Sequence, residues 1–185
     1  MNKTIIFISG FGVPQFVAQS RFVWNKPFWS DYQCLWLPSL TPTSDKMVER
    51  ELDHLEDLMA QHPGATLAGH SLGGWWAANL ALRPQVVIKK MVLWTPLCDT
   101  SSYPIFNVTP RYYPPYQVNH NLPLHGPERV LIVSAEHDLI VPCDQHAFPL
   151  FMCFLCQQYK LFGGHFYQTN HQARLSYMKD WIECQ

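Results

Sequence analysis

The sequence predicts an α/β fold built as a doubly wound, mainly parallel six-stranded sheet. Short runs rich in β-branched and aromatic residues alternate along the chain with segments of helical periodicity. The sequence shows no internal repeats and no linker that would divide it. Apolar residues make up 48% and charged residues 15% of the 185 positions, which is a globular composition. We therefore expect one domain spanning residues 1–185.

The first elements of this sheet are recognisable from composition and from the residues that end them. Residues 4–9 are β-branched and aromatic and predict a buried strand closed by Gly10. Residues 17–29 are weakly periodic and indicate a short helix. Residues 32–37 predict a second strand, which Pro38 stops.

A longer helix is expected to begin at Ser44 and Asp45 and to end at residues 62–64. Its charged residues lie opposite one apolar face formed by Val48, Leu52, Leu55 and Met59. The remaining expected elements are strands at 65–68, 88–94, 130–134 and 159–162 and helices at 72–82, about 143–157 (bent at Pro149) and about 169–183.

Residues 95–127 interrupt the alternation. They contain seven prolines among tyrosine, phenylalanine and asparagine residues, without a convincing period. A segment of this length without regular structure is usually a lid, a binding loop or a mobile segment. Because it follows the carboxyl end of a strand, we expect a short Pro/aromatic-rich lid or substrate loop, with an irregular packing loop as the alternative.

The pentapeptide Gly69-His70-Ser71-Leu72-Gly73 has the G-x-S-x-G form of a nucleophile elbow. It joins a predicted strand to an apolar helix. Such an abrupt turn forces the corner residue into strained backbone geometry, and the flanking glycines relieve the crowding. The turn would present the Ser71 hydroxyl at the carboxyl edge of the sheet. The alternative is a serine that merely caps the helix.

A serine hydroxyl becomes a nucleophile when a histidine accepts its proton and a carboxylate orients that histidine. Asp138 and His165 each follow a predicted strand, and the chain order Ser71, Asp138, His165 suits nucleophile, acid and base on such a sheet. We predict that these three residues are catalytic.

Other residues compete for the same roles. Asp99, after the fourth strand, and Glu136, after the fifth, are alternative acids, and His171 is an alternative base inside a predicted helix. His70 is too close to Ser71 along the turn to reach its hydroxyl, and we expect His137 at the surface.

An oxyanion hole needs two backbone N–H groups. Leu72, directly after the nucleophile, would supply one of them. The loop after the first strand would supply the other, with Phe11 as the first candidate and Gly12 as the next.

The sequence predicts no metal and no organic cofactor. The glycines at 10 and 12 lack the third glycine of a dinucleotide fingerprint. His137, Cys143 and His146 lack the compact ligand spacing of known zinc sites.

Charge and cysteine usage limit partners and location. Thirteen basic and 14 acidic residues leave a net charge of −1, so nothing points to nucleic acid or an anionic membrane. No run is long enough to span a membrane, and no feature points to a protein partner. The six scattered cysteines read as reduced thiols, with Cys153 and Cys156 more typical of a core than of a redox motif. The apolar run at 5–8 is broken early by glycines and Pro14, so we expect mature sequence in the cytoplasm.

On these motifs the chain resembles the α/β-hydrolase superfamily over nearly its whole length. The matching segments are Gly-His-Ser-Leu-Gly around Ser71, Glu-His-Asp-Leu-Ile-Val-Pro around Asp138, and Gly-Gly-His-Phe around His165. It is most similar to the compact serine hydrolases related to the retinoblastoma-binding serine hydrolase and the bacterial YdeN proteins. Size, Trp24, Trp29 and the polar stretch 168–170 carry that closer likeness, whereas Tyr167 and the loop Ser-Gly-Phe-Gly at 9–12 depart from it.

The resemblance implies a minimal hydrolase fold, without the two leading antiparallel strands and helical cap of larger members. It implies a serine hydrolase that cleaves small carboxylic esters or thioesters through an acyl-enzyme. The alternative is a protein-binding module on the same scaffold, with weak or no hydrolase activity.

Overall fold

The computed structural model describes residues 3–14, 28–38, 40–98, 100, 103, 106, 128–154, 157–161, 163–165 and 171–184. All strand pairs are parallel, and the six strands follow the spatial order β2-β1-β3-β4-β5-β6. The strands are β1 (Thr4–Ile8), β2 (Gln33–Leu37), β3 (Thr66–His70), β4 (Lys90–Trp94), β5 (Arg129–Ala135) and β6 (Gln157–Leu161). The helices are α2 (Asp45–Gln61), α3 (Leu72–Ala81), α4 (Ala147–Phe154) and α5 (His171–Glu183). The predicted α/β fold class is confirmed.

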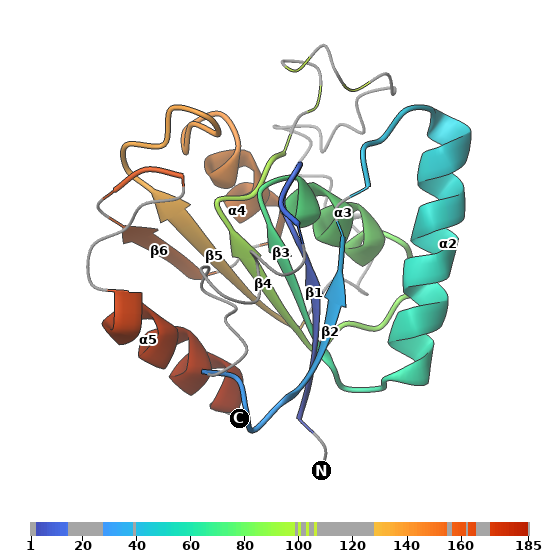
Figure 1. The fold of residues 1–185 in the computed structure, drawn as a ribbon, viewed down its shortest axis with the longest axis horizontal. Helices are drawn as coiled ribbons and strands as arrows, with labels where there is room; N and C mark the ends of the chain where they lie inside the picture. The colour runs from blue at the N-terminus through green and yellow to red at the C-terminus, as the bar shows by residue number, and fades with distance from the viewer. Residues whose placement is uncertain are drawn as a thin grey trace.

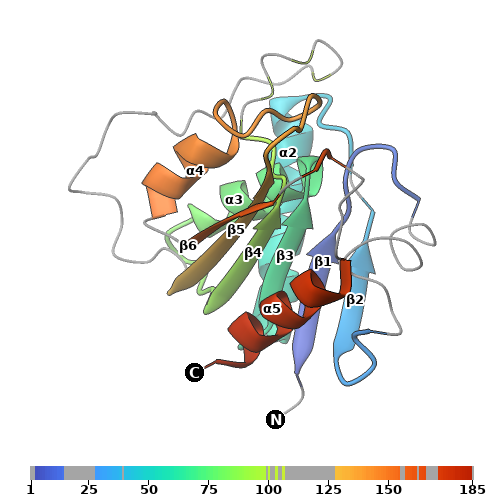
Figure 2. The same cartoon turned by 90° about the vertical axis from the view of Figure 1, so that its left-hand side faces the viewer.

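Helices cover both faces of the sheet (Figure 1). Figure 2 shows α5 on one side of the strands and α3 and α4 on the other. Alternate residues of β1 serve the two faces: Ile6 and Ile8 pack with α2 and α3, whereas Ile5 and Phe7 pack with α5. Because both faces are buried, the central strands are continuous apolar runs in the sequence.

The start of α2 matches its sequence prediction. Ser44 is the N-cap, and its side-chain oxygen accepts a hydrogen bond from the Met47 N–H at 3.2 Å. The predicted apolar face, Val48, Leu52, Leu55 and Met59, is buried. On its other side, Arg83 forms ion pairs with Glu49, Asp53 and Glu56, which tie the segment after α3 to α2.

The expected helix at 143–157 is wrong at both ends. The N–H groups of Gln145 and His146 both donate to the Pro142 carbonyl in a turn, and α4 starts only at Ala147. Pro149 is therefore in the first turn of α4, where its missing N–H removes no intrahelical bond, so it need not bend the helix. At the other end, Gln157 is the first residue of β6, because it pairs with Leu131 of β5.

Several other expectations fall on residues outside the description. These are the helix at 17–29 apart from its last two residues, Trp24, Asp99, most of the segment 95–127, the side chain of Cys153, Cys156, and residues 166–170. Phe28 and Trp29 lie in a turn, where the Tyr32 N–H donates to the Trp29 carbonyl. Cys34, Cys98, Cys143 and Cys184 form no disulfide within the described part of the chain.

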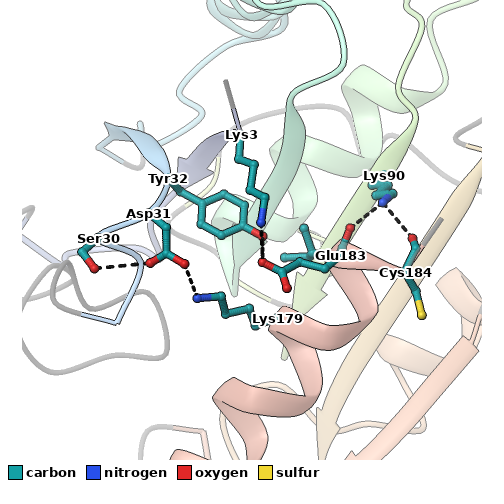
Figure 3. Close-up of polar contacts among 9 residues, drawn as sticks. Lys3, Ser30, Asp31, Tyr32, Lys90, Lys179, Glu183 and Cys184 are labelled. Carbon is teal, nitrogen blue, oxygen red and sulfur yellow. Dashed lines mark hydrogen bonds and ion pairs between the residues drawn. The ribbon is translucent and has the colours of Figure 1, made fainter. Parts of the chain in front are cut away.

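Polar contacts hold α5 to the amino ends of the strands (Figure 3). Glu183 accepts hydrogen bonds from Lys3 at 2.7 Å and from the Tyr32 hydroxyl at 3.0 Å. Lys90, at the start of β4, donates to the carbonyl oxygens of Ile182 and Cys184. Both ends of the described chain therefore lie at this edge, opposite the edge at which the strands end (Figure 1).

Candidate active site

Ser71 is the single residue between the end of β3 and the start of α3. Its backbone angles are φ 54° and ψ −119°, and among the described non-glycine residues only Ser71 and Thr95 have positive φ. Two hydrogen bonds of 3.0 Å hold this strained conformation: Ser71 N–H donates to Trp94, and the Ser71 carbonyl accepts from Leu97. Ser71 occupies the N-cap position of α3, but its side chain makes no capping hydrogen bond to the helix.

Gly69 and Gly73 are required by the packing of this turn. A Cβ atom on Gly69 would lie 2.4 Å from the Gly73 carbonyl oxygen. A Cβ atom on Gly73 would lie 2.0 Å from the carbonyl oxygen of Ile8, the last residue of β1. The two glycines therefore let α3 start directly against β1 and β3, as the pentapeptide motif led us to expect.

Asp138 and His165 lie together in the loops after β5 and β6. His165 Nδ1 is 2.7 Å from Asp138 Oδ2, and the two residues are 6% and 5% exposed. The other carboxylate oxygen, Oδ1, accepts hydrogen bonds from the N–H groups of Ile140 at 2.9 Å and Val141 at 2.8 Å. Three hydrogen bonds thus set the position of the carboxylate against the imidazole.

The loop that carries His165 needs a glycine. Gly163 has φ 137°, a conformation that other residues rarely adopt, and its carbonyl accepts from the His137 N–H at 3.0 Å. This bond ties the loop after β6 to the loop after β5, beside Asp138.

The alternative residues are placed as follows. Glu136 and His137 are exposed, as expected for His137, and it is Asp138 that contacts His165. Asp99 is outside the described residues. His171 is the first residue of α5, and its side chain is likewise outside them.

His70 connects the three loops at this edge. Its ring packs on the His165 ring, with centroids 5.1 Å apart and planes inclined by 38°. A Cβ atom on Gly10 would lie 2.8 Å from His70 Nδ1 and 3.2 Å from Ser71 Cβ. The loop after β1, the Ser71 turn and the His165 loop therefore meet around one imidazole. Sequence reasoning tested His70 only as a base and missed this packing role, for which the sequence contains no signal.

Burial, and to a smaller extent the neighbouring His165, lower the pKa of His70 to about 3, while a hydrogen bond with the His165 backbone opposes the shift. His70 is therefore neutral at physiological pH. A neutral ring adds no positive charge next to His165.

The candidate oxyanion donors are at the same edge. Leu72 is the first residue of α3, where backbone N–H groups lack intrahelical acceptors. Phe11 follows Gly10 in a turn in which the Val13 N–H donates to the Gly10 carbonyl at 3.3 Å. The Phe11 ring is half exposed and packs edge-on against Phe106, with centroids 5.8 Å apart.

His146, which the sequence analysis weighed only as a zinc ligand, has other contacts. Its Nδ1 accepts from the Cys98 N–H at 3.2 Å, and its Nε2 lies 3.4 Å from the Tyr103 hydroxyl. Within the described ranges, no three His, Cys, Asp or Glu side chains gather as a metal site would require.

Two surface concavities differ in their relation to the strands. One of about 160 Å³ lies where β1 and β2 end and is lined mainly by apolar side chains: Ile8, Leu37, Pro38, Leu40, Glu51, His54, Leu55 and Trp76. Another, of about 1180 Å³, lies at the amino ends of the strands, beside Lys3, Lys90 and Arg129. Open parallel sheets bind ligands at the carboxyl ends, so the larger concavity is on the wrong edge and the candidate site is the one around Ser71. No helix in the described part of the chain is long and apolar enough to cross a membrane.

Comparison with known proteins gives a match in structure but not in sequence. No protein-family model and no curated protein matches the chain. The ydeN gene product from B. subtilis is similar over 99% of this chain and 100% of its own, with a TM-score of 0.71 and 16% identity. Arabidopsis thaliana SOBER1 is similar over 99% and 98%, with a TM-score of 0.65 and 13% identity. A Xanthomonas campestris protein assigned to the alpha/beta hydrolase superfamily is similar over 99% of this chain and 99% of its own, with a TM-score of 0.63 and 16% identity. The structural neighbours include proteins of the α/β-hydrolase superfamily, and the chain has the α/β-hydrolase fold.

Proposed function

We propose that this protein is a serine hydrolase that cleaves carboxylic esters or thioesters through an acyl-enzyme intermediate. The observation that carries the proposal is the buried 2.7 Å contact between His165 and Asp138, at the sheet edge where Ser71 has a strained conformation. Strained residues and buried histidine–carboxylate pairs are both typical of catalytic sites. The α/β-hydrolase fold supports the general class, hydrolase.

In the proposed mechanism, the Nδ1–H of His165 donates a hydrogen bond to the Asp138 carboxylate, which leaves the lone pair on Nε2. Nε2 accepts the Ser71 hydroxyl proton as the oxygen attacks the substrate carbonyl. The N–H groups of Leu72 and Phe11 stabilise the resulting oxyanion. His165 then protonates the leaving group, and water hydrolyses the acyl-enzyme by the same route. These steps need no metal and no organic cofactor.

The proposed substrate is a small molecule with an apolar acyl group. An apolar concavity of about 160 Å³ lies at the same edge, where β1 and β2 end, and its lining does not include Ser71, Asp138 or His165. We place the protein in the cytoplasm, in keeping with cysteines that read as reduced thiols.

A second candidate function is a protein-binding module on this fold. Leu139 is 93% exposed and Ile140 is 49% exposed, beside Asp138 at the same edge as the half-exposed Phe11. Apolar side chains exposed in this way favour contact with a partner.

A fluorophosphonate probe tests the proposal. We expect it to label the wild-type protein and to leave Ser71→Ala unlabelled, whereas persistent labelling of the variant would reveal another nucleophile. His165→Ala should lower kcat on a short p-nitrophenyl ester by about 10³-fold or more and leave the circular dichroism spectrum unchanged. His171→Ala is the control and should stay active. If the wild-type protein neither takes up the probe nor hydrolyses any short p-nitrophenyl ester, the binding module is the better account.

A further inference from the structure

A buried histidine outside the proposed triad has both ring nitrogens near polar groups. His146 is 2% exposed, and its Nδ1 accepts a hydrogen bond from the backbone N–H of Cys98, just after β4. An accepting Nδ1 carries the lone pair, so in the neutral ring the proton is on Nε2. Nε2 faces the hydroxyl oxygen of Tyr103 at 3.4 Å.

The same Tyr103 hydroxyl also contacts the loop that carries Asp138. With its oxygen facing His146, the Tyr103 hydroxyl donates its own proton to the carbonyl oxygen of Ile140 at 2.5 Å. That carbonyl belongs to the same peptide group as the N–H of Val141. The Val141 N–H in turn donates to Asp138 Oδ1 at 2.8 Å.

One peptide group therefore has a donor on its oxygen and the Asp138 carboxylate on its nitrogen. Hydrogen bonds arranged in series polarise one another, so a donor on the carbonyl strengthens the N–H bond to the carboxylate. It also keeps the peptide plane from rotating, in a loop where Leu139 and Ile140 are largely exposed.

We propose that Tyr103 and His146 are positioning residues for Asp138, acting through the peptide group between Ile140 and Val141. The proposal rests on the proposed function, in which Asp138 orients the catalytic histidine. His146 positions the Tyr103 hydroxyl, and that hydroxyl positions the loop after β5 that carries Asp138. Neither side chain takes part in the reaction itself.

The segment that carries Tyr103 also reaches the loop after β1, in which Phe11 is a proposed oxyanion donor. The Tyr103 ring packs against Phe106 with centroids 6.0 Å apart, and Phe106 packs against Phe11 at 5.8 Å. Residues after β4 thus contact the loop after β1 and the loop after β5, on both sides of Ser71. A change at Tyr103 that spares its ring would leave the aromatic contacts intact and remove only the two contacts of the hydroxyl, with His146 and with the Ile140 carbonyl.

Tyr103→Phe makes that change, and Tyr32→Phe is its matched control. The Tyr32 hydroxyl bonds to Glu183 at the opposite edge of the sheet. We expect Tyr103→Phe to lower kcat on a p-nitrophenyl ester roughly tenfold with KM within about twofold of wild type, because misplacement of catalytic groups acts on the chemical step. Tyr32→Phe should leave both constants unchanged.

A spectroscopic readout separates positioning from loss of folding. In proton NMR, the Nδ1–H of a histidine bonded to a carboxylate resonates at low field, and this signal reports the contact between His165 and Asp138 directly. We expect Tyr103→Phe to shift or broaden it and Tyr32→Phe to leave it in place. An unshifted resonance together with wild-type kcat in Tyr103→Phe would overturn the proposal. A shifted resonance in a protein that hydrolyses no ester would support the positioning role while the proposed function fails.

His146 gives a second test with a rescue. The amide of His146→Gln can accept from Cys98 with its oxygen and donate to Tyr103 with its nitrogen, whereas His146→Phe can do neither. We expect kcat to stay near wild type in the first variant and to fall as in Tyr103→Phe in the second. The double variant Tyr103→Phe/His146→Phe should fall no further than either single change, since both break one chain of contacts. Full additivity, or equal losses in the glutamine and phenylalanine variants, would contradict the proposal.

Discussion

His70 shows how packing fixes the charge of one residue at this site. Its neighbours are Gly10, Ser71 and the ring of His165, and it is almost fully buried. Burial, followed by the nearby His165, lowers its pKa to about 3. In the unfolded chain the pKa of the same imidazole returns to its ordinary value of 6.5. His70 therefore links folding to pH.

The sign of this linkage follows from proton counting. Between pH 6.5 and about 3 the unfolded chain binds a proton at His70 that the folded chain does not. The free energy of unfolding should therefore fall as the pH is lowered through this window, with His70 contributing up to about 1.4 kcal/mol per pH unit. Urea unfolding across this pH range should show a shallower acid slope for His70→Asn than for wild type. His137→Asn, at an exposed histidine, should keep the wild-type slope. Equal slopes in all three proteins would show that His70 is protonated in the folded state.

At the scale of elements, the junction between β3 and α3 requires residues without side chains at two positions, Gly69 and Gly73. The α3 helix starts against the end of β1, with no space between Gly73 and the Ile8 backbone. The obstructing atom is main-chain oxygen, which cannot move away as a flexible side chain can. The position of Ser71 thus depends on how closely a helix approaches a neighbouring strand.

Gly73→Ala should therefore displace the turn. Its Cβ would lie 2.0 Å from the Ile8 oxygen, and relieving that overlap should cost about 1–3 kcal/mol of unfolding free energy. Gly164→Ala is the matched control at the same edge, because among the described residues its Cβ would meet only the His137 oxygen, at 3.5 Å. We expect that control to stay within about 0.5 kcal/mol of wild type. Urea unfolding measures both, and equal stability of the two variants would contradict the packing argument.

On the scale of the whole molecule, the candidate site and the contacts that hold α5 lie at opposite edges of the sheet. The carboxyl edge carries Ser71, Asp138 and His165, while the amino edge carries the contacts of α5 with Lys3, Tyr32 and Lys90. In the described part of the chain, α5 is the one helix that contributes to the apolar cluster on its face of the sheet. Its residues Leu175, Met178, Trp181 and Ile182 pack there with residues of β1, β3, β4 and β5. Its attachment at the amino edge thus helps to keep these apolar strand residues buried.

Glu183→Gln should loosen that attachment. The hydrogen bond from Lys3 and then that from Tyr32 hold the pKa of Glu183 below its ordinary value, so the contribution of this carboxylate is present at neutral pH and is lost as the pH falls through its folded-state pKa. At neutral pH and low salt, amide hydrogen exchange in α5 should be faster in the variant than in wild type, and the difference should shrink at high salt. Glu128 is an exposed acid that lines, with Glu183, the concavity at the amino ends of the strands. Glu128→Gln should leave amide exchange in α5 unchanged. Unaltered exchange in Glu183→Gln would mean that apolar packing alone holds the helix.

Local patterns in the sequence were sufficient for the parallel α/β class, for the α2 cap at Ser44 and its buried face, and for the sharp turn at Ser71. Each depends on residues within a few positions of one another, through side-chain periodicity, capping or glycine geometry. The chain order Ser71, Asp138, His165 also pointed to three loops on one edge, although their roles in catalysis stay a prediction. At 143–157 the sequence predicted one helix, whereas the structure has α4 only from Ala147 to Phe154, and Gln157 pairs with Leu131 as the first residue of β6.

Tertiary structure alone decided which loops touch. The strand order places β1 beside β3, which brings Gly10 against His70 and Ser71. It also folds the segment after β4 so that Tyr103 reaches the Ile140 carbonyl. Such contacts join residues far apart in the chain, and no local period or turn signal encodes them. They arise because six parallel strands end at one edge, where loops of unrelated sequence must share a small space and satisfy each other's polar groups.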